Sequence, residues 1–234
     1  MKTFFEEFVW KPDYTALLLS YAYVFAIIAL GELLRRVGNR HIGFTRKFIH
    51  IGVGMWVLGT VLLFDTWQLA LIPPATFVLI NAFSYWRGTF KAMEAEEPGN
   101  LGTIYFPISF GALVYFLWDQ PTLLVASMMP LTWGDALAAI MGQRYGHYHW
   151  TIGGRTRSVE GSVAMLLWSW IPTFLALFLM PYVVGETPVN WLMAFIYSGA
   201  VSVVCTLVEA LSPWGIDNLT VPAAAAFLLL ALRN

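Results

Sequence analysis

The chain has 234 residues, of which 59% are hydrophobic and only 12% are charged, and its formal net charge is −1. Soluble domains usually carry about 25% charged residues. At a mean hydropathy of +0.67, polar side chains are too few to cover a soluble fold of this size. The composition therefore argues against a soluble enzyme, a disordered chain and a nucleic-acid binder, and the one cysteine, Cys205, excludes an internal disulfide.

Eight apolar runs along the chain are candidates for membrane-spanning helices. They cover residues 14–34, 48–64, 67–85, 104–118, 122–141, 159–180, 191–211 and 219–232. The eighth run is short for a full crossing and has Pro222 near its start, so seven spans are the alternative. We expect an all-α, polytopic integral membrane helical bundle of about eight transmembrane helices, with residues 1–234 forming a single membrane domain.

Basic residues concentrate in the connections after the first, third and fifth runs, which hold 10 of the 13 Lys and Arg residues. These residues are Arg35, Arg36, Arg40, Arg46, Lys47, Arg87, Lys91, Arg144, Arg155 and Arg157. Because Lys and Arg mark cytoplasmic loops, we expect these three connections, together with the turn at residues 212–218, to face the cytoplasm.

Five carboxylates lie inside or at the ends of apolar runs: Glu32, Asp135, Glu160, Glu209 and Asp217. A carboxylate within the hydrocarbon region costs about 2.5–3.5 kcal/mol on insertion scales, so it is normally paired or functional. We expect Glu32 to pair with a neighbouring arginine on its own helix. All five lie toward the predicted cytoplasmic side, and this predicts a polar site at one membrane face.

The first candidate segment covers residues 131–162. It contains small residues around Asp135, a proline just before it at Pro130, a glycine pair, and Arg155 and Arg157 alternating with hydroxyl side chains. Glycines let backbone N–H groups approach an anion, arginines bind it in a forked manner, and a following helix N-terminus adds a favourable dipole. This composition favours a polyphosphate, although an ordinary basic loop touching lipid headgroups accounts for the same residues. The chain has no Walker A phosphate-binding loop.

The second candidate segment covers residues 208–222, where Glu209 is followed by Asp217 and Asn218 with helix-breaking Pro213 and Gly215 between them. Hard oxygen ligands of this kind suit Mg²⁺, which prefers one or two carboxylates together with substrate phosphates. A turn that only caps the final helix through Asp217 or Asn218 is the alternative.

The third candidate segment lies at residues 43–54 and contains Arg46, Lys47 and His50. A cytoplasmic anchor explains the two cations without any function, and a lone histidine is more often packed than catalytic. The other histidines have no partner at metal-ligand spacing, so a zinc site is not expected.

At these residues the chain resembles a family of membrane lipid-alcohol kinases that includes phytol, farnesol and dolichol kinases and CTP-dependent diacylglycerol kinases. The likeness runs from about Arg35 to the end of the chain. Its matching pieces are TRKFIHIGVG, NLGTIYFPIS, GDALAAIMGQRYG, RTRSVEGS and VEALSPWGIDNLTVP, in the order of the family. Two departures stand out. Gly142-Gln143-Arg144 displaces the usual arginine by one position, and Arg157 stands where lysine is common.

The resemblance implies Mg²⁺-dependent phosphoryl transfer from CTP to the hydroxyl of a long isoprenoid alcohol at the cytoplasmic membrane face. It implies catalytic roles for Asp135, Asp217 and His50, with Asp135 as the first candidate for the base. The metal ligands would be Asp135, Glu209 and Asp217. The nucleotide would contact Lys47, Arg144, Arg155, Arg157, Ser158, Glu160, Gly161 and Asn218.

Several alternatives stay open. The same residues resemble those of membrane cytidylyltransferases that make CDP-diacylglycerol, and a CTP-dependent diacylglycerol kinase would share the whole set. A transporter for a small solute or an ion also places charges inside a membrane, although such charges usually lie near the midplane. The apolar runs do not encode which alcohol is the acceptor.

Overall fold

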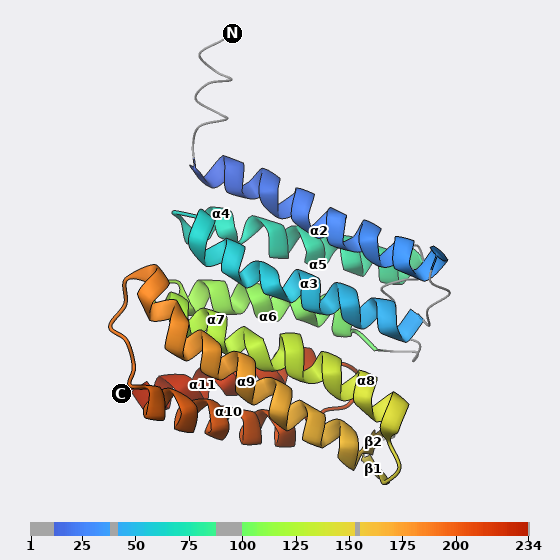
Figure 1. The fold of residues 1–234 in the computed structure, drawn as a ribbon. Coiled ribbons are helices and arrows are strands. Elements are labelled where there is room, and N and C mark those ends of the chain that lie inside the picture. Colours follow the sequence, from blue (N-terminus) through green and yellow to red (C-terminus); the bar gives the residue numbers. More distant parts are fainter. Residues whose placement is uncertain (1–11, 38–41, 88–99, 153–154, 234) are drawn as a thin grey trace.

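The computed structural model describes residues 12–37, 42–87, 100–152 and 155–233 as a helical bundle with one short hairpin (Figure 1). The helices are α2 (Pro12–Val37), α3 (Ile42–Leu63), α4 (Trp67–Ala70), α5 (Ile72–Arg87), α6 (Gly102–Leu117), α7 (Pro121–Met129), the π-helical turn η1 (Pro130–Asp135), α8 (Ala136–Tyr145), α9 (Val159–Val184), α10 (Trp191–Leu211) and α11 (Asp217–Arg233). The strands are β1 (His149–Ile152) and β2 (Arg155–Ser158). The predicted all-α fold class is confirmed.

Six helical segments in the described ranges are long and apolar enough to cross a membrane. They are Asp13–Val37, Gly43–Leu63, Trp67–Arg87, Pro121–Tyr145, Val159–Val184 and Trp191–Leu211. The predicted fourth and eighth spans correspond to α6 and α11, which have 16 and 17 residues. At 1.5 Å per residue these two helices measure about 24–26 Å, which is short of a hydrocarbon core about 30 Å thick.

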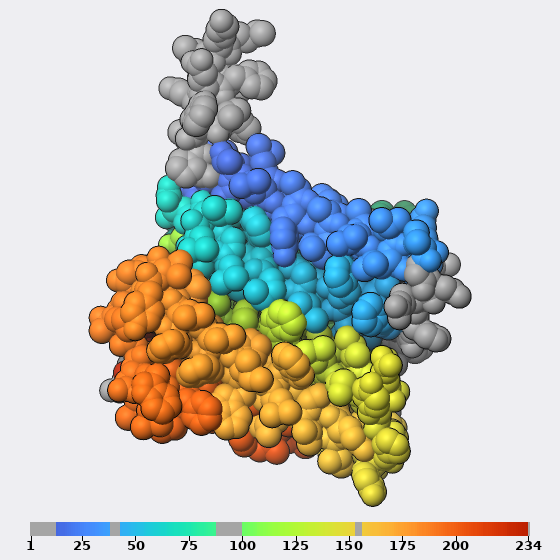
Figure 2. Space-filling view, viewed as in Figure 1, coloured from blue at the N-terminus to red at the C-terminus, as the bar shows by residue number. Residues whose placement is uncertain are grey.

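The segment formed by α7, η1 and α8 is the centre of the bundle. In its most apolar stretch of 18 residues, 78% of the residues are buried. In the other membrane-length helices this share is 17–39%. Leu124, Met128 and Leu131 are fully enclosed. Figure 2 shows the consequence on one face, where only a narrow strip of this segment separates α3 from α9. Side chains on its inner faces are therefore held by neighbours on nearly all sides.

The central segment departs from regular α-helix at Pro130. Proline has no N–H to donate to the helical ladder, and the six residues from Pro130 to Asp135 form a π-helical turn. Such turns occur mostly as single insertions in α-helices, frequently at functional sites. Here the turn ends at Asp135, one of the predicted site residues.

The described segments that flank the basic connections lie at one end of the bundle (Figure 1). The C-terminal end of α2, the first turn of α3 and the β1–β2 hairpin all lie there. The hairpin was expected to be a loop. Its strands pair antiparallel, with Trp150 opposite Arg157, and Trp150, Thr151, Ile152 and Thr156 are β-branched or aromatic residues, which favour strands. Ser158 then starts α9 as its N-cap and accepts a hydrogen bond from the Gly161 N–H at 3.1 Å.

Candidate active site

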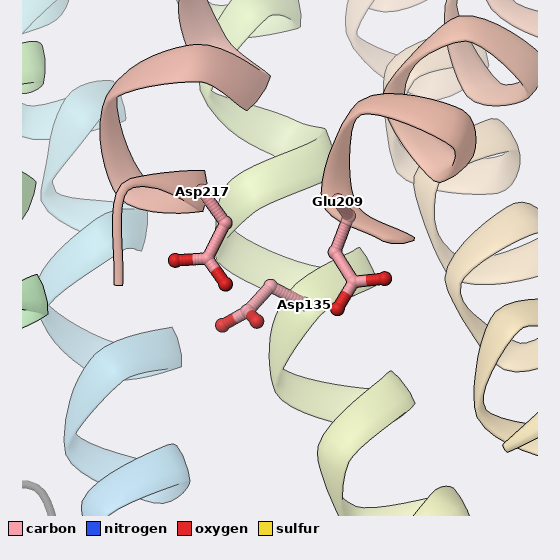
Figure 3. Close-up of side chains that lie close together, drawn as sticks. All are labelled: Asp135, Glu209 and Asp217. Carbon is pink, nitrogen blue, oxygen red and sulfur yellow. The ribbon is translucent and has the colours of Figure 1, made fainter. Parts of the chain in front are cut away.

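Three carboxylates from different helices meet near this end of the bundle (Figure 3). Asp135 comes from η1, Glu209 from α10 and Asp217 from the first turn of α11, and their side chains point toward one another. One oxygen of each lies within 4.8 Å of one oxygen of each of the others, and all three residues are buried. Three buried carboxylates so close together stay charged only where cations compensate them, either from the protein or from a ligand.

The first cation comes from α3. The Nζ of Lys47 lies 2.6 Å from Oδ2 of Asp135, and both side chains are largely buried. One turn further along α3, the Nε2 of His50 lies 3.8 Å from the same carboxylate oxygen. That nitrogen makes a shorter contact, of 2.8 Å, with the carbonyl oxygen of Leu131 in η1. Because a carbonyl only accepts, the Nε2 of His50 is the donor in this contact.

The second cation is Arg157 at the end of β2. Its Nη1 forms an ion pair with the carboxylate of Glu209, and its Nη2 lies 3.4 Å from Oδ2 of Asp217. Nη2 also donates to the carbonyl oxygens of Glu209, at 3.1 Å, and of Ser212, at 3.4 Å. The fork of the guanidinium thus joins the hairpin, the end of α10 and the start of α11.

The turn that presents Asp217 and Asn218 is tightly packed. Gly215 has φ = 79°, in the left-handed region, and a side chain there would strike the Oδ1 of Asn100. That Oδ1 accepts from the Gly102 N–H at 2.9 Å. The Nδ2 of Asn218 donates to the Gly215 carbonyl at 3.1 Å and to Oδ1 of Asp217 at 3.0 Å. The Asp217 carboxylate is therefore oriented from within its own turn.

A cavity of about 520 Å³ connects these groups to the interior of the bundle. Its polar end is lined by the three carboxylates, Arg46, Lys47 and Arg157. Its other end is lined by apolar side chains of α2, α3, α5 and α6, among them Val24, Ile28, Val53, Trp56, Phe77 and Phe110. The same space therefore offers a charged wall to a polar group and an apolar wall to a hydrocarbon.

Not all of the predicted nucleotide-contact residues line the cavity. Lys47, Arg157, Ser158, Gly161 and Asn218 line the cavity. Glu160 and Arg144 are not among its lining residues. The Oε1 of Glu160 accepts from the His147 N–H at 3.0 Å, and the guanidinium of Arg144 lies 5.3 Å from the ring centre of Tyr145. The side chain of Arg155 lies outside the described part of the structure.

Several cavity residues were not predicted, and the clearest is Asn81 on α5. Its Nδ2 donates to the Thr103 carbonyl at 2.7 Å, and within the described part of the chain its buried Oδ1 has no hydrogen-bond partner. An asparagine deep inside the mostly apolar run of residues 67–85 was a visible signal. Asn100 and Phe106 also line the cavity; they lie in NLGTIYFPIS, one of the pieces that carry the family resemblance, but neither was singled out as a site residue.

A membrane-length helical bundle with a buried carboxylate cluster facing an apolar cavity defines a polytopic membrane protein with a site for an amphiphilic ligand. The chain belongs to the phytol kinase family. It is 31% identical to the phytol kinase of Synechocystis sp., over 93% of this chain and 91% of that protein. It is 26% identical to the probable chloroplastic phytol kinase 1 of Glycine max, over 94% of this chain and 76% of that protein.

A similar relation, at 26% identity, holds for the probable chloroplastic phytol kinase 1 of Oryza sativa subsp. japonica, over 93% of this chain and 74% of that protein. No protein-family model matches the chain, and no solved structure matches it. The predicted membership in a family of lipid-alcohol kinases is confirmed.

Proposed function

We propose that this protein transfers the γ-phosphoryl group of CTP to the hydroxyl of an isoprenoid alcohol of the phytol type, at the cytoplasmic face of a membrane. The supporting observation is the convergence of Asp135, Glu209 and Asp217 with Lys47 and Arg157 at the boundary between the charged and the apolar parts of one cavity. The similarity to proteins named phytol kinases supports the acceptor class. CTP as the donor rests on the sequence resemblance.

The donor set of the three carboxylates fits Mg²⁺. Their oxygens are hard ligands within 4.8 Å of one another, and the cation prefers a few carboxylates together with substrate phosphates. Asp135, Glu209 and Asp217 would hold the Mg²⁺ ion, and its chemical contribution would be positive charge that offsets the charge developing during transfer.

The protein's own cations and one helix terminus supply the rest of the phosphate site. Arg157 and Lys47 are within reach of the carboxylates and carry positive charge on the same wall. The capped N-terminus of α9 brings Ser158 and Gly161 to the wall of the cavity, so the positive end of this helix's dipole lies beside them. A triphosphate therefore meets positive charge from three separate elements.

Asp135 is the proposed base. The reaction forms a bond from the alcohol oxygen to the γ-phosphorus and breaks the bond to the β-phosphate oxygen, so the products are a phosphorylated alcohol, CDP and the proton of the hydroxyl. Asp135 accepts this proton, while the contact with Lys47 fixes its orientation. For His50, donation to the Leu131 carbonyl favours positioning of α3 against η1 over proton transfer.

The test is a transfer assay on the purified protein in lipid nanodiscs with γ-labelled CTP, ATP, GTP and UTP. The acceptors are phytol, farnesol, geranylgeraniol, dolichol and diacylglycerol. We expect label on an isoprenoid alcohol, with CTP as the best donor and CDP as the coproduct. Pyrophosphate with a CDP-lipid would overturn the proposal in favour of a cytidylyltransferase. Label on diacylglycerol alone would replace the acceptor class.

A further inference from the structure

The apolar part of the cavity follows one face of α3 away from the charged end. The lining residues Lys47, His50, Val53 and Trp56 recur every three residues along this helix. Trp56 is nine positions after Lys47, which corresponds to a depth of about 13.5 Å. Along this face the lining changes from the ammonium group of Lys47 to the indole of Trp56. We call the part of the cavity with apolar lining the apolar arm; it begins beside the three carboxylates.

Trp56 lies at the deep end of this arm, as the last residue of α3 that lines the cavity. Its ring stacks on Tyr23 with the ring centres 4.8 Å apart, and its Nε1 donates to the Oγ of Ser20 at 3.0 Å. Tyr23 is held in turn, because its hydroxyl donates to the Gly52 carbonyl at 2.8 Å. The ring of Trp56 lies close over Gly59, where a Cβ would come within 2.7 Å of it. The indole is thus fixed by α2 and by the next turn of α3.

The other walls at this depth are also apolar. Pro74 and Phe77 on α5, Phe110 on α6 and Val24 on α2 line the cavity there. These residues leave an acceptor's hydrocarbon chain no polar partner, and they suit a branched isoprenoid. The cavity of about 520 Å³ is in the range that holds one ligand of drug size, so a nucleotide and a very long acceptor would not both fit inside it.

We propose that the indole of Trp56 is the floor of the acceptor-binding arm and sets the length of isoprenoid chain that the enzyme prefers. The inference rests on the proposed function and adds a specificity-determining residue to it. An acceptor whose hydroxyl reaches Asp135 must place its chain along the face of α3, and the fixed indole ends that path. Replacing the indole by a methyl group extends the arm into the volume that the ring now fills.

The experiment is a competition between acceptors. Farnesol, geranylgeraniol and a longer polyprenol are mixed in equal amounts in the same nanodiscs, and the ratio of phosphorylated products is measured by mass spectrometry. This ratio reports relative kcat/KM and does not depend on how much of the enzyme is folded. The variants are Trp56→Ala and Trp56→Phe. The matched control is Trp170→Ala, because Trp170 also packs on an aromatic ring, Phe195 at 4.8 Å, and donates to one carbonyl, but does not line the cavity.

We expect Trp56→Ala to shift the product ratio toward the longest alcohol by about tenfold or more, the scale on which apolar pockets discriminate single groups. Trp56→Phe should shift it less, and Trp170→Ala should leave it as in the wild type. An unchanged ratio in an active Trp56→Ala protein would overturn the inference, since the chain would then leave the cavity sideways into the lipid. If the wild-type protein phosphorylated none of the alcohols, the proposed function itself would be overturned.

Discussion

The ammonium nitrogen of Lys47 lies 2.6 Å from Oδ2 of Asp135, and this contact joins residues that are 88 positions apart in the chain. It connects α3 to η1 at the point where Asp135 also faces Glu209 and Asp217. Formally, Lys47 and Arg157 offset two of the three negative charges in the cluster. The remaining negative charge is available to a bound cation, while Lys47 holds the Asp135 carboxylate in one orientation.

Asp135→Asn should lower the rate of phosphoryl transfer by at least about 100-fold, since a general base contributes roughly 10²–10⁴. The amide keeps the size of the side chain and one oxygen that accepts from Lys47, so the helical bundle should remain folded. Single-turnover transfer and thermal unfolding in detergent measure the two effects separately. Glu32→Gln is the control, because Glu32 pairs with Arg35 and Arg36 outside the cavity. A near-normal rate for Asp135→Asn would remove Asp135 from the chemistry.

Arg157→Lys should lower both the unfolding temperature and the transfer rate, the rate by about tenfold, because an ammonium group cannot reproduce the planar fork. The guanidinium contacts the carboxylates of Glu209 and Asp217 and the carbonyls of Glu209 and Ser212 at once. Arg36→Lys, at an exposed arginine of the same membrane end, should change neither quantity. If Arg157→Lys also left the unfolding temperature and the transfer rate unchanged, positive charge alone would be sufficient at this position.

Mg²⁺ should bind to the protein without nucleotide and raise its unfolding temperature, because a ligand specific for the folded state stabilises it by mass action. Asp217→Asn should weaken this effect and raise the apparent Kd for Mg²⁺ by about tenfold or more. Titration of the unfolding temperature with Mg²⁺, in protein first treated with EDTA, measures the affinity independently of activity. If wild type and Asp217→Asn respond alike, Asp217 is not a ligand.

Much of the bundle was predictable because apolar length and charged ends are properties of the local sequence. Runs of apolar residues located the helices, and the carboxylates at their ends indicated Asp135, Glu209 and Asp217, which the structure brings together. What local patterns do not contain is the rotation of each helix about its axis. Successive residues on an α-helix differ by about 100°, so Gln143 lines the cavity while Arg144 is exposed beside Tyr145.

The apolar arm was unpredictable for a related reason. Its lining comes from α2, α3, α5 and α6. The residues that form this lining are of the same apolar types that occur throughout membrane helices. Only packing distinguishes Trp56, which faces the cavity, from Trp86, which is 75% exposed on the outer surface. Asn81 differs because a polar amide in an apolar helix is a local signal by itself.

The proposed cytoplasmic position of the site predicts opposite labelling of two exposed threonines. Thr151 lies in β1, before α9, and Thr187 follows the end of that membrane-length helix. In a Cys205→Ala background, an impermeant thiol reagent added to intact cells should label Thr187→Cys and leave Thr151→Cys unlabelled. Inverted vesicles should give the reverse pattern. Labelling of Thr151→Cys from outside would place the hairpin, and with it Arg157, on the opposite face.

Gly215→Ala should destabilise the protein more than Gly185→Ala, although both glycines have similar backbone angles, φ = 79° and 75°. The left-handed conformation costs a residue with a Cβ about 1–2 kcal/mol at either position. At Gly185 a new Cβ meets nothing within 4 Å, whereas at Gly215 it would strike the Oδ1 of Asn100 and lie 2.7 Å from the backbone nitrogen of Gly102. Gly215→Ala must therefore move the turn that carries Asp217. The difference between the two unfolding temperatures isolates this packing contribution, and only Gly215→Ala should also lower the transfer rate. Equal losses of stability with normal transfer would show that the turn relaxes without displacing the Asp217 carboxylate.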